Sequence, residues 1–236
     1  MHDIQAICVR NNAEFCDRVC RSHGVPGMFE HSLWIQQQRG PAFYPNVITM
    51  TREDSLEQTA RIAALRAQSP EIAVKDSFAT LDLATIGMRL LFDAEWLWMT
   101  PAPARHGAAP TESWRKVDTA ADLAHWQAAW RGNEPPLASP VFLPDLLEDP
   151  SIAVLAAWHG TTIVAGCVLN RDSSGSVGLS NLFAAAAGRD RTIAAAVDHA
   201  REWVPGAMLV GYESGDDLAP MQARGFRSAG PLRVWV

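Results

Sequence analysis

The sequence predicts a mixed α/β (α+β) protein made of two similar units, each with a mixed central sheet flanked by helices. Segments with helical and strand periodicity alternate along the chain. A stretch rich in proline and alanine divides the 236 residues near their middle. One local pattern recurs on both sides of it, because Gly87 and Gly225 each follow a short predicted helix and precede a predicted strand. We therefore expect a duplicated unit in which the two glycines occupy matching places.

Residues 1–100 form the first predicted unit. Asn11 or Asn12 is the expected cap of its first helix, and Gly24 is the expected stop. Strands are recognised by short apolar runs between turn-forming residues. In chain order, the expected elements are a helix at 13–22, strands at 33–35 and 47–50, a helix from 54–55 that ends before Pro70, a strand at 72–74, a short helix at 81–85 and a strand at 88–99.

Residues 101–113 are predicted to be a linker, because their prolines and glycine are incompatible with a helix or a central strand. The alternative is a long surface loop within one domain. Residues 114–236 form the second predicted unit. Its expected elements are a strand at 114–117, a helix capped by Asp118 or Thr119 that runs past Trp130, strands at 152–158, 162–169, 177–184 and 207–212, helices at 191–204 and 216–224, and a last strand at 232–236.

Charge and hydropathy exclude several classes of function. The formal net charge is -6 and the arginines and lysines form no stripe, so we expect no nucleic-acid partner. No segment reaches the roughly 18 continuous apolar residues that a membrane helix needs. The N-terminus has no basic stretch followed by an apolar run, so no signal peptide is expected and the cytoplasm is the predicted location.

The four cysteines, Cys8, Cys16, Cys20 and Cys167, have no spacing typical of a disulfide framework. Cys16, Cys20 and His23 share one face of the first helix, where three such ligands are able to hold a metal. No fourth ligand stands near them in the sequence, so a buried face with ordinary thiols is favoured and no metal is expected. Cys167 lies in a strand that looks buried, which favours a core residue over a nucleophile.

Three local features of the second unit point to one family. A strand at 179–184 leads into a helix, residues 189–194 (RDRTIA) lie at the start of that helix, and residues 221–226 (MQARGF) end a short helix in Gly-Phe. With the order of elements, they make residues 114–236 resemble the GNAT superfamily of acyl-CoA N-acyltransferases. The first unit resembles a partial, degenerate copy, because it has no recognisable phosphate loop around residues 51–54 and an acidic pair there would repel a pyrophosphate. We expect that unit to be a scaffold.

The resemblance implies that acetyl-CoA, or another acyl-CoA, is the co-substrate and an amine is the acceptor; a homodimer is compatible with it. In the family the acyl-CoA arm lies in a gap beside the strand that corresponds to residues 179–184. The N–H groups at the start of the following helix face the pyrophosphate. Thr192 stands where the family has Gly, which would crowd the phosphates. The implied cofactor-binding residues are Leu182, Phe183, Ala184, Arg189, Asp190, Arg191, Thr192, Ile193, Ala194 and Ser214.

Catalysis in this family is a direct attack by a neutral amine on the thioester, so a base or a water chain must take a proton. Glu213 ends the strand that flanks the expected gap and is the first candidate for the base. The tyrosine that protonates the leaving thiolate in many members is replaced by Met221. Tyr212 and Tyr44 are the only tyrosines in the chain, so the usual acid is missing unless one of them reaches the site, and Tyr212 is the predicted one. Without such an acid, the CoA thiol would have to leave as a thiolate.

A second class of protein explains the same departures from the family pattern. A GNAT-fold protein that binds a ligand or regulates a partner, and has lost catalysis, needs no general acid and tolerates Thr192 and Met221. His159 and His199 are weaker candidates for the base, because the first begins a tight turn and the second is expected on a solvent-facing helix.

Overall fold

The computed structural model describes residues 3–102, 113–184 and 188–236, and these build one continuous sheet of eleven strands in the order β1-β2-β3-β4-β11-β5-β10-β9-β8-β7-β6. The helices are α1 (Ile4–Ser22), α2 (Ser55–Gln68), α3 (Ala120–Arg131), α4 (Arg189–Trp203) and α5 (Leu218–Ala223), with short 3-10 helices η1 (Leu83–Ile86), η2 (Pro144–Glu148) and η4 (Gly215–Asp217). The strands are β1 (Met28–Phe29), β2 (Leu33–Ile35), β3 (Val47–Thr49), β4 (Val74–Asp76), β5 (Leu90–Met99), β6 (Ser113–Lys116), β7 (Ile152–His159), β8 (Thr162–Arg171), β9 (Val177–Ala184), β10 (Leu209–Glu213) and β11 (Arg227–Trp235).

The two halves of the chain repeat one order of elements, as the sequence predicts. In each half a parallel strand pair, β3 with β4 and β9 with β10, is joined by a crossover helix, α2 or α4. A short helix and a long last strand follow in both halves. Gly87 ends η1 with φ 78°, and Gly225 follows α5 with φ 107°, so both adopt the left-handed conformation that favours glycine. The predicted fold class and the matching glycines are confirmed.

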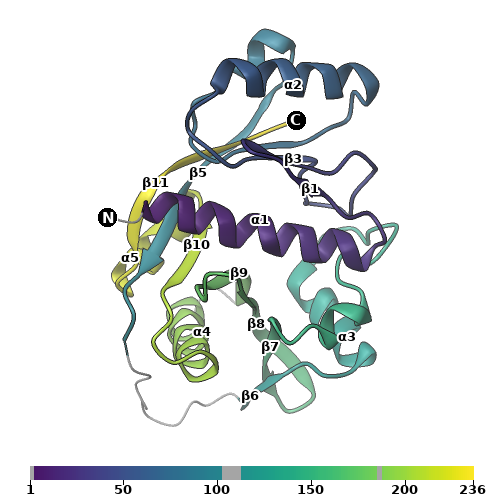
Figure 1. Cartoon of the computed structure of the whole chain (residues 1–236). Helices are drawn as coiled ribbons and strands as arrows, with labels where there is room; N and C mark the ends of the chain where they lie inside the picture. The colour runs from purple at the N-terminus through teal and green to yellow at the C-terminus, as the bar shows by residue number, and fades with distance from the viewer. Residues whose placement is uncertain (1–2, 103–112, 185–187) are drawn as a thin grey trace.

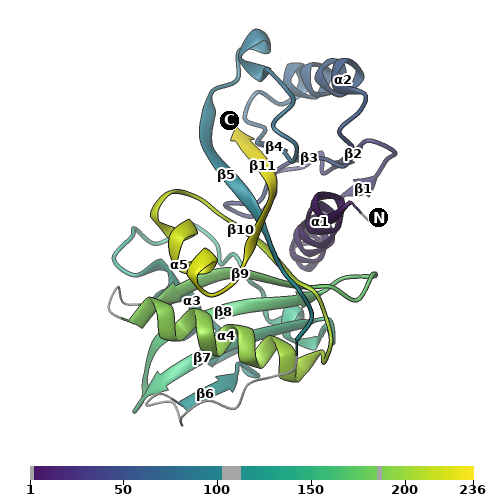
Figure 2. The same ribbon diagram turned by 90° about the vertical axis from the view of Figure 1, so that its left-hand side faces the viewer.

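Each half contributes its last strand to the part of the sheet built by the other half. The strand β5 pairs with β10 of the second half, and β11 pairs with β4 of the first half, while β5 and β11 pair with each other. Figure 2 shows these two long strands crossing together between the upper and lower parts of the molecule. The halves are therefore interlocked within one sheet. The division at residues 101–113 stays a prediction, since residues 103–112 lie outside the described part of the chain.

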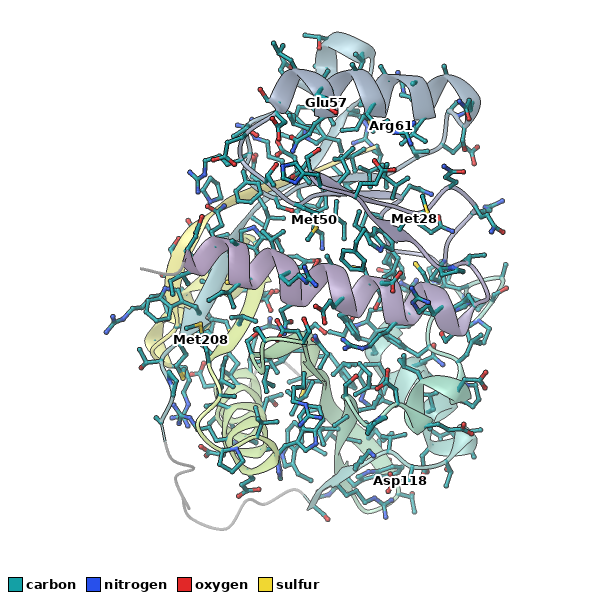
Figure 3. All side chains as sticks on the ribbon, viewed as in Figure 1. Met28, Met50, Glu57, Arg61, Asp118 and Met208 are labelled. Atoms are coloured by element: carbon teal, nitrogen blue, oxygen red, sulfur yellow. The ribbon has the colours of Figure 1, made fainter. Side chains whose placement is uncertain are left out.

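Helix α1 lies in the middle of the molecule, between the layers built by the two halves (Figure 1). Its apolar face packs on a cluster that includes Trp96 from the first half and Val210 from the second. Met50 and Met208 also pack on this cluster, and Figure 3 shows them on opposite sides of the helix. Because this helix contacts residues of both halves, its side chains are able to line a site between them.

The first helix is nine residues longer than the sequence predicts. It begins at Ile4, where the Asp3 carboxylate accepts hydrogen bonds from the N–H groups of Gln5 and Ala6, and the predicted start at residue 13 was wrong. Asn11 resembles a cap in the sequence but is buried, and its side-chain amide donates to Ser176 in the second half. A tertiary hydrogen bond explains this asparagine, which local pattern misreads as a helix start.

Two helical layers cover opposite faces of the second half. One cluster of apolar side chains lies under α4 and α5 and includes Ile193 and Phe226, and a second lies under α3 and includes Trp126 and Phe142. The last strand begins at Arg227 rather than at the predicted residue 232, because it pairs with almost the whole of β5. The sequence analysis missed β1 and η2. Among the described residues, no helix combines the length and the apolar character that crossing a membrane requires.

Candidate active site

Strands β9 and β10 begin as a parallel pair and then separate, which creates a gap in the sheet. They pair only at Leu209 with Val177 and at Val210 with Gly178. Gly211 marks the end of close approach, because a Cβ there would lie 2.7 Å from the Leu179 carbonyl oxygen. Beyond this point the gap opens into a cavity of about 200 Å³. A gap beside this strand is also what the resemblance of the sequence to the GNAT superfamily implies.

A bulge in β9 shapes one wall of the cavity. Asn181 has a positive φ of 50°, and the pairing of β9 with β8 shifts register between the partners of Ser180 and Phe183. The side chains that follow point to opposite faces of the sheet: Leu182 packs under α4, whereas Phe183 packs under α3 with its ring 5.2 Å from that of Trp126. The bulge interrupts the ladder, so a backbone group in this segment is able to face a ligand.

Glu213 lies at the end of β10, on the edge of the same cavity. The side chain is partly buried, and burial raises the pKa of the Glu213 carboxyl to about 7. The Arg189 guanidinium opposes this shift and the Asp217 carboxylate adds to it. A carboxyl whose pKa lies near neutral pH is able to accept a proton and to release it again, which is the property that a general base requires.

Both tyrosines of the chain, Tyr44 and Tyr212, line this cavity. Tyr212 precedes Glu213 on β10, whereas Tyr44 comes from the loop between β2 and β3 in the first half. Burial raises the pKa of Tyr44 well above its ordinary value, and its interaction with the Asn181 side chain lowers it in part. Met221, at the position of the usual acid, is 2% exposed and lies in the core under α5. The tertiary structure therefore brings two phenols to a site from which the expected one is missing.

The N-terminus of α4 carries the predicted phosphate-binding residues. The Arg189 guanidinium forms an ion pair of 3.0 Å with Asp217, and its buried Nε has no hydrogen-bond partner within the described residues. Asp190 and Arg191 are exposed in the first turn. Residues 192–194, whose N–H groups are predicted to face the pyrophosphate, lie in the first two turns of the helix, which begins at Arg189. The side chains of Thr192 and Ile193 are buried, and the binding of a phosphate by this helix end stays a prediction.

The remaining predicted residues are close by. Ala184 is the last residue of β9 and pairs with Ala165. Ala194 lies one turn into α4, away from the helix end. Ser214 follows Glu213, and its carbonyl accepts a hydrogen bond from the N–H of Asp217 in the turn η4. Of the predicted site residues, Leu182, Tyr212 and Glu213 line the cavity. Arg189 lies near enough to Glu213 to lower the pKa of its carboxyl, and the binding role of the whole set stays a prediction.

Sequence reasoning missed a charged group in the cavity. Lys75, on β4 of the first half, is 4% exposed, and its ammonium donates a hydrogen bond of 2.7 Å to Asn12 Oδ1. The same ammonium lies 4.3 Å from the Tyr212 ring centre and 5.9 Å from that of Trp96. The sequence predicts a strand at 72–74 and a turn from residue 75, whereas β4 extends to Asp76 and includes the lysine. A lysine directly after an apolar strand was a weak signal, because buried lysines are rare unless they are paired.

The corresponding strands of the first half do not open. The N–H of Ser77 donates to Thr49 Oγ1 at 2.7 Å, so a side chain bridges β3 and β4 just beyond their paired residues. The Asp76 carboxylate accepts hydrogen bonds from the N–H groups of Phe78, Thr80 and Leu81. These hydrogen bonds hold the ends of β3 and β4 together where β9 and β10 separate, which favours a scaffold role for this half.

Other candidate groups lie outside this site. Cys167 is fully buried and burial raises its pKa, so the thiol stays protonated. His159 is exposed at a turn. His199, on α4, lies with its ring centre 5.7 Å from that of Trp114 on β6. Of the three residues of the α1 face, Cys16 and Cys20 are buried and His23 Nε2 contacts the Val141 carbonyl oxygen at 2.8 Å. Within the described ranges, no group of three or more His, Cys, Asp or Glu side chains is arranged to hold a metal ion.

Solved structures share the fold of this chain. A GCN5-related N-acetyltransferase from Kribbella flavida is 15% identical with a TM-score of 0.65, and the match covers 100% of this chain and 96% of that protein. The chain has the GNAT fold. A protein described as an acetyltransferase of the GNAT family, from Novosphingobium aromaticivorans DSM 12444, is 13% identical with a TM-score of 0.60, over 98% of this chain and 96% of that one.

The tandem form of the GNAT fold is also represented among solved structures. A tandem GNAT protein from the clavulanic acid biosynthesis pathway is 10% identical with a TM-score of 0.52, over 100% of this chain and 96% of that protein. No protein-family model matches the sequence, and no curated protein matches it. At these identities the similarity establishes the GNAT fold, and the chemistry has to be argued from the site.

Proposed function

We propose that this GNAT-fold protein is an N-acyltransferase that moves an acetyl group from acetyl-CoA, or an acyl group from another acyl-CoA, to the amine of a small molecule. The observation that carries the proposal is the opening between β9 and β10 with Glu213 at its edge, because burial holds the pKa of this carboxyl near 7. A gap through the sheet admits a thioester from the α4 face and an amine from the α1 face. A base at their meeting point is what aminolysis of a thioester requires.

The residues around the gap fit an acyl-CoA. The buried Nε of Arg189 is a donor without a hydrogen-bond partner in the described structure, placed at a helix N-terminus where an anion is favoured. The backbone of residues 182–184 borders the space for the pantetheine arm. The Arg189 guanidinium forms an ion pair of 3.0 Å with the Asp217 carboxylate, so the pyrophosphate has to compete with this carboxylate for Arg189. Cofactor affinity therefore depends on the balance between one arginine and one aspartate.

The reaction follows from the positions of the cavity residues. Ionised Glu213 takes a proton from the ammonium form of the acceptor, directly or through a water molecule. The amine nitrogen then forms a bond to the thioester carbonyl carbon, and an N–H of the bulged β9 segment stabilises the negative charge on the carbonyl oxygen. The C–S bond breaks, the sulfur keeps the electron pair, and Tyr212 protonates it. The extra proton on the new amide nitrogen then passes to the Tyr212 oxygen, directly or through a water molecule, which leaves a neutral amide and a neutral phenol. Positioning of the two substrates supplies the rest of the rate enhancement.

Two measurements on the purified chain test this function. Calorimetric titration with acetyl-CoA and with desulfo-CoA reports whether the gap binds the cofactor. Release of free CoA thiol in the presence of a broad panel of primary amines reports turnover, and we expect amine-dependent release that stops when Glu213 is replaced by Gln. If acetyl-CoA binds but no amine is acylated, the proposed enzymatic function is refuted and a GNAT-fold binding protein is favoured. The burial of Met221 in the core is the observation that favours this second function.

A further inference from the structure

The cavity contains a positive charge that the proposed reaction does not use. Lys75 is one of only two lysines in the chain and is 4% exposed, yet its side chain lines the cavity beside Tyr212. Transfer of an ammonium out of water is costly unless the charge is paired and its donors are satisfied. The environment of Lys75 therefore indicates what the cavity is built to hold.

The protein satisfies Lys75 only in part. An ammonium has three N–H donors, and within the described residues one of them reaches an acceptor, Asn12 Oδ1 at 2.7 Å. The Tyr212 ring, 4.3 Å away, and the more distant Trp96 ring contribute cation–π attraction but accept no conventional hydrogen bond. No carboxylate of the described residues lies within 4.0 Å of the ammonium. Among the residues that the structure describes, the charge is therefore held by neutral groups and has no counter-ion.

The rest of the cavity suits a small ligand with opposite charges. Its polar lining comes mainly from side-chain amides and hydroxyls, and among the described lining residues Lys75 is the only cation and Glu213 the only carboxylate. A volume of about 200 Å³ is below the roughly 300–1,000 Å³ of pockets for drug-sized molecules. A single ammonium matches a singly charged carboxylate better than a phosphate dianion, which would need a further cation.

We infer that the acceptor carries a carboxylate in addition to its amine, and that Lys75 binds this carboxylate while Glu213 faces the amine. The acceptor is then a small amino acid or a related amino carboxylate. This inference rests on the proposed function for its amine, whereas the anion subsite at Lys75 stands on the cavity alone. Asn12 acts as the positioning residue that orients the ammonium.

Matched acceptor pairs test the inference. L-Methionine and L-phenylalanine are compared with their carboxamides, and γ-aminobutyrate with its amide, by following acetyl-CoA-dependent release of CoA thiol. The wild type is expected to prefer the carboxylate member of at least one pair by tenfold or more in kcat/KM, which corresponds to about 1.4 kcal/mol. In Lys75→Met the preference is expected to vanish through a higher KM for the carboxylate, with the carboxamide unaffected. Lys116→Met, which removes the other, exposed lysine, is expected to keep the preference.

A second variant tests the same subsite in case Lys75→Met does not fold. Asn12→Asp is nearly isosteric and places a carboxylate 2.7 Å from the ammonium, so Lys75 gains an internal counter-ion that competes with the ligand. It is expected to lose the carboxylate preference as Lys75→Met does, with a cooperative unfolding transition retained. Equal rates for acid and amide in the wild type, or a preference that survives both variants, would overturn the inference. Acetylation of Lys75 itself by acetyl-CoA alone, seen by mass spectrometry, would also overturn it.

Binding measurements separate this inference from the proposed function. If no amine is acylated, calorimetry with N-acetyl-L-methionine and N-acetyl-L-methioninamide still reports on the anion subsite. Tighter binding of the acid in the wild type, lost in Lys75→Met, supports the subsite while the acyltransfer reaction fails. If amines are acylated but carboxylates are not preferred over amides, the proposed acyltransferase function is supported and the role of Lys75 in binding a carboxylate is refuted. If no amine is acylated and the acid and the amide bind equally well, both the acyltransferase function and the anion subsite at Lys75 are refuted.

Discussion

The ammonium of Lys75 lies 4.3 Å from the ring centre of Tyr212, and the two residues occupy matching places in the two halves of the chain. Lys75 and Asp76 end β4, and Tyr212 and Glu213 end the equivalent strand β10. The repeated strands therefore contribute a cation and a phenol to one cavity. The residues that follow them, Asp76 and Glu213, have different surroundings. The Asp76 side chain is fully buried and accepts hydrogen bonds from backbone N–H groups, whereas Glu213 borders an open gap. One half has kept a gap and the other has closed it.

Replacement of Glu213 by Gln is expected to lower kcat/KM for acetyl transfer by about a hundredfold or more, because the amine loses its proton acceptor. In the wild type kcat/KM is expected to rise with pH up to about 7 and then to level off, following ionisation of the carboxyl. Initial rates from pH 5.5 to 8.5 measure both effects. Glu71→Gln, at an exposed position, serves as the control and should match the wild type. A variant with normal rates would remove Glu213 from the mechanism.

The same carboxyl should make stability depend on pH. Burial raises the pKa of Glu213 from its ordinary value of 4.5 to about 7, so the folded protein holds this proton more tightly than the unfolded chain does. The resulting stabilisation is fully present below about pH 4.5 and is lost as pH rises through 7. Glu213→Gln removes this dependence. Between pH 5 and pH 8, the urea midpoint is expected to fall less in the variant than in the wild type. An equal fall in both proteins would contradict a raised pKa of the buried Glu213 carboxyl.

The two cavity tyrosines are expected to differ. Tyr212→Phe should lower kcat by about tenfold or more with acetyl-CoA, because the thiolate leaves without its acid, and Tyr44→Phe should lower it only slightly. The loss in Tyr212→Phe should shrink when the acyl donor is an S-aryl thioester, whose thiol is more acidic and leaves unaided. Steady-state kinetics on both donors measures this. The opposite ranking of the two variants would assign the acid to Tyr44.

Cofactor affinity is expected to respond in opposite directions to two changes at the start of α4. Combined Arg189→Glu and Arg191→Glu should weaken acetyl-CoA binding by more than tenfold, or about 1.4 kcal/mol, because two positive charges near the phosphates become negative. Asp217→Asn should strengthen binding, because it frees Arg189 from its 3.0 Å ion pair. Calorimetric titration measures both, with circular dichroism to verify the fold. Unchanged affinity in the double variant would place the cofactor elsewhere.

The paired glycines should matter for stability in both halves. Gly87→Ala and Gly225→Ala each force a Cβ into a left-handed conformation, which costs roughly 1–2 kcal/mol. Gly87→Ala should cost more than this, since its Cβ would lie 2.8 Å from an Arg66 guanidinium nitrogen, whereas the nearest atom at Gly225 is 3.9 Å away. Denaturant unfolding gives both values. Gly160→Ala, at a positive φ but in open space, provides the comparison without a steric clash.

The sequence by itself determined the local elements and their repetition. Apolar periodicity identified α2, α4 and most strands, and glycines in left-handed turns marked the same place in both halves. It also identified Glu213 at a strand end, because strand and turn signals lie next to each other in the chain. These features depend on residues a few positions apart, which is the range over which propensity and periodicity act.

Only the tertiary structure decided how the two halves join and what the cavity contains. The exchange of β5 and β11 depends on strand pairing between residues more than a hundred positions apart, such as Arg227 with Trp98, and no local pattern specifies the partner. For the same reason, Tyr44 and Lys75 from the first half reach a site that the second half opens. The burial of an ammonium and the near-neutral pKa of Glu213 arise from desolvation by distant segments, so they exist only once the chain has folded.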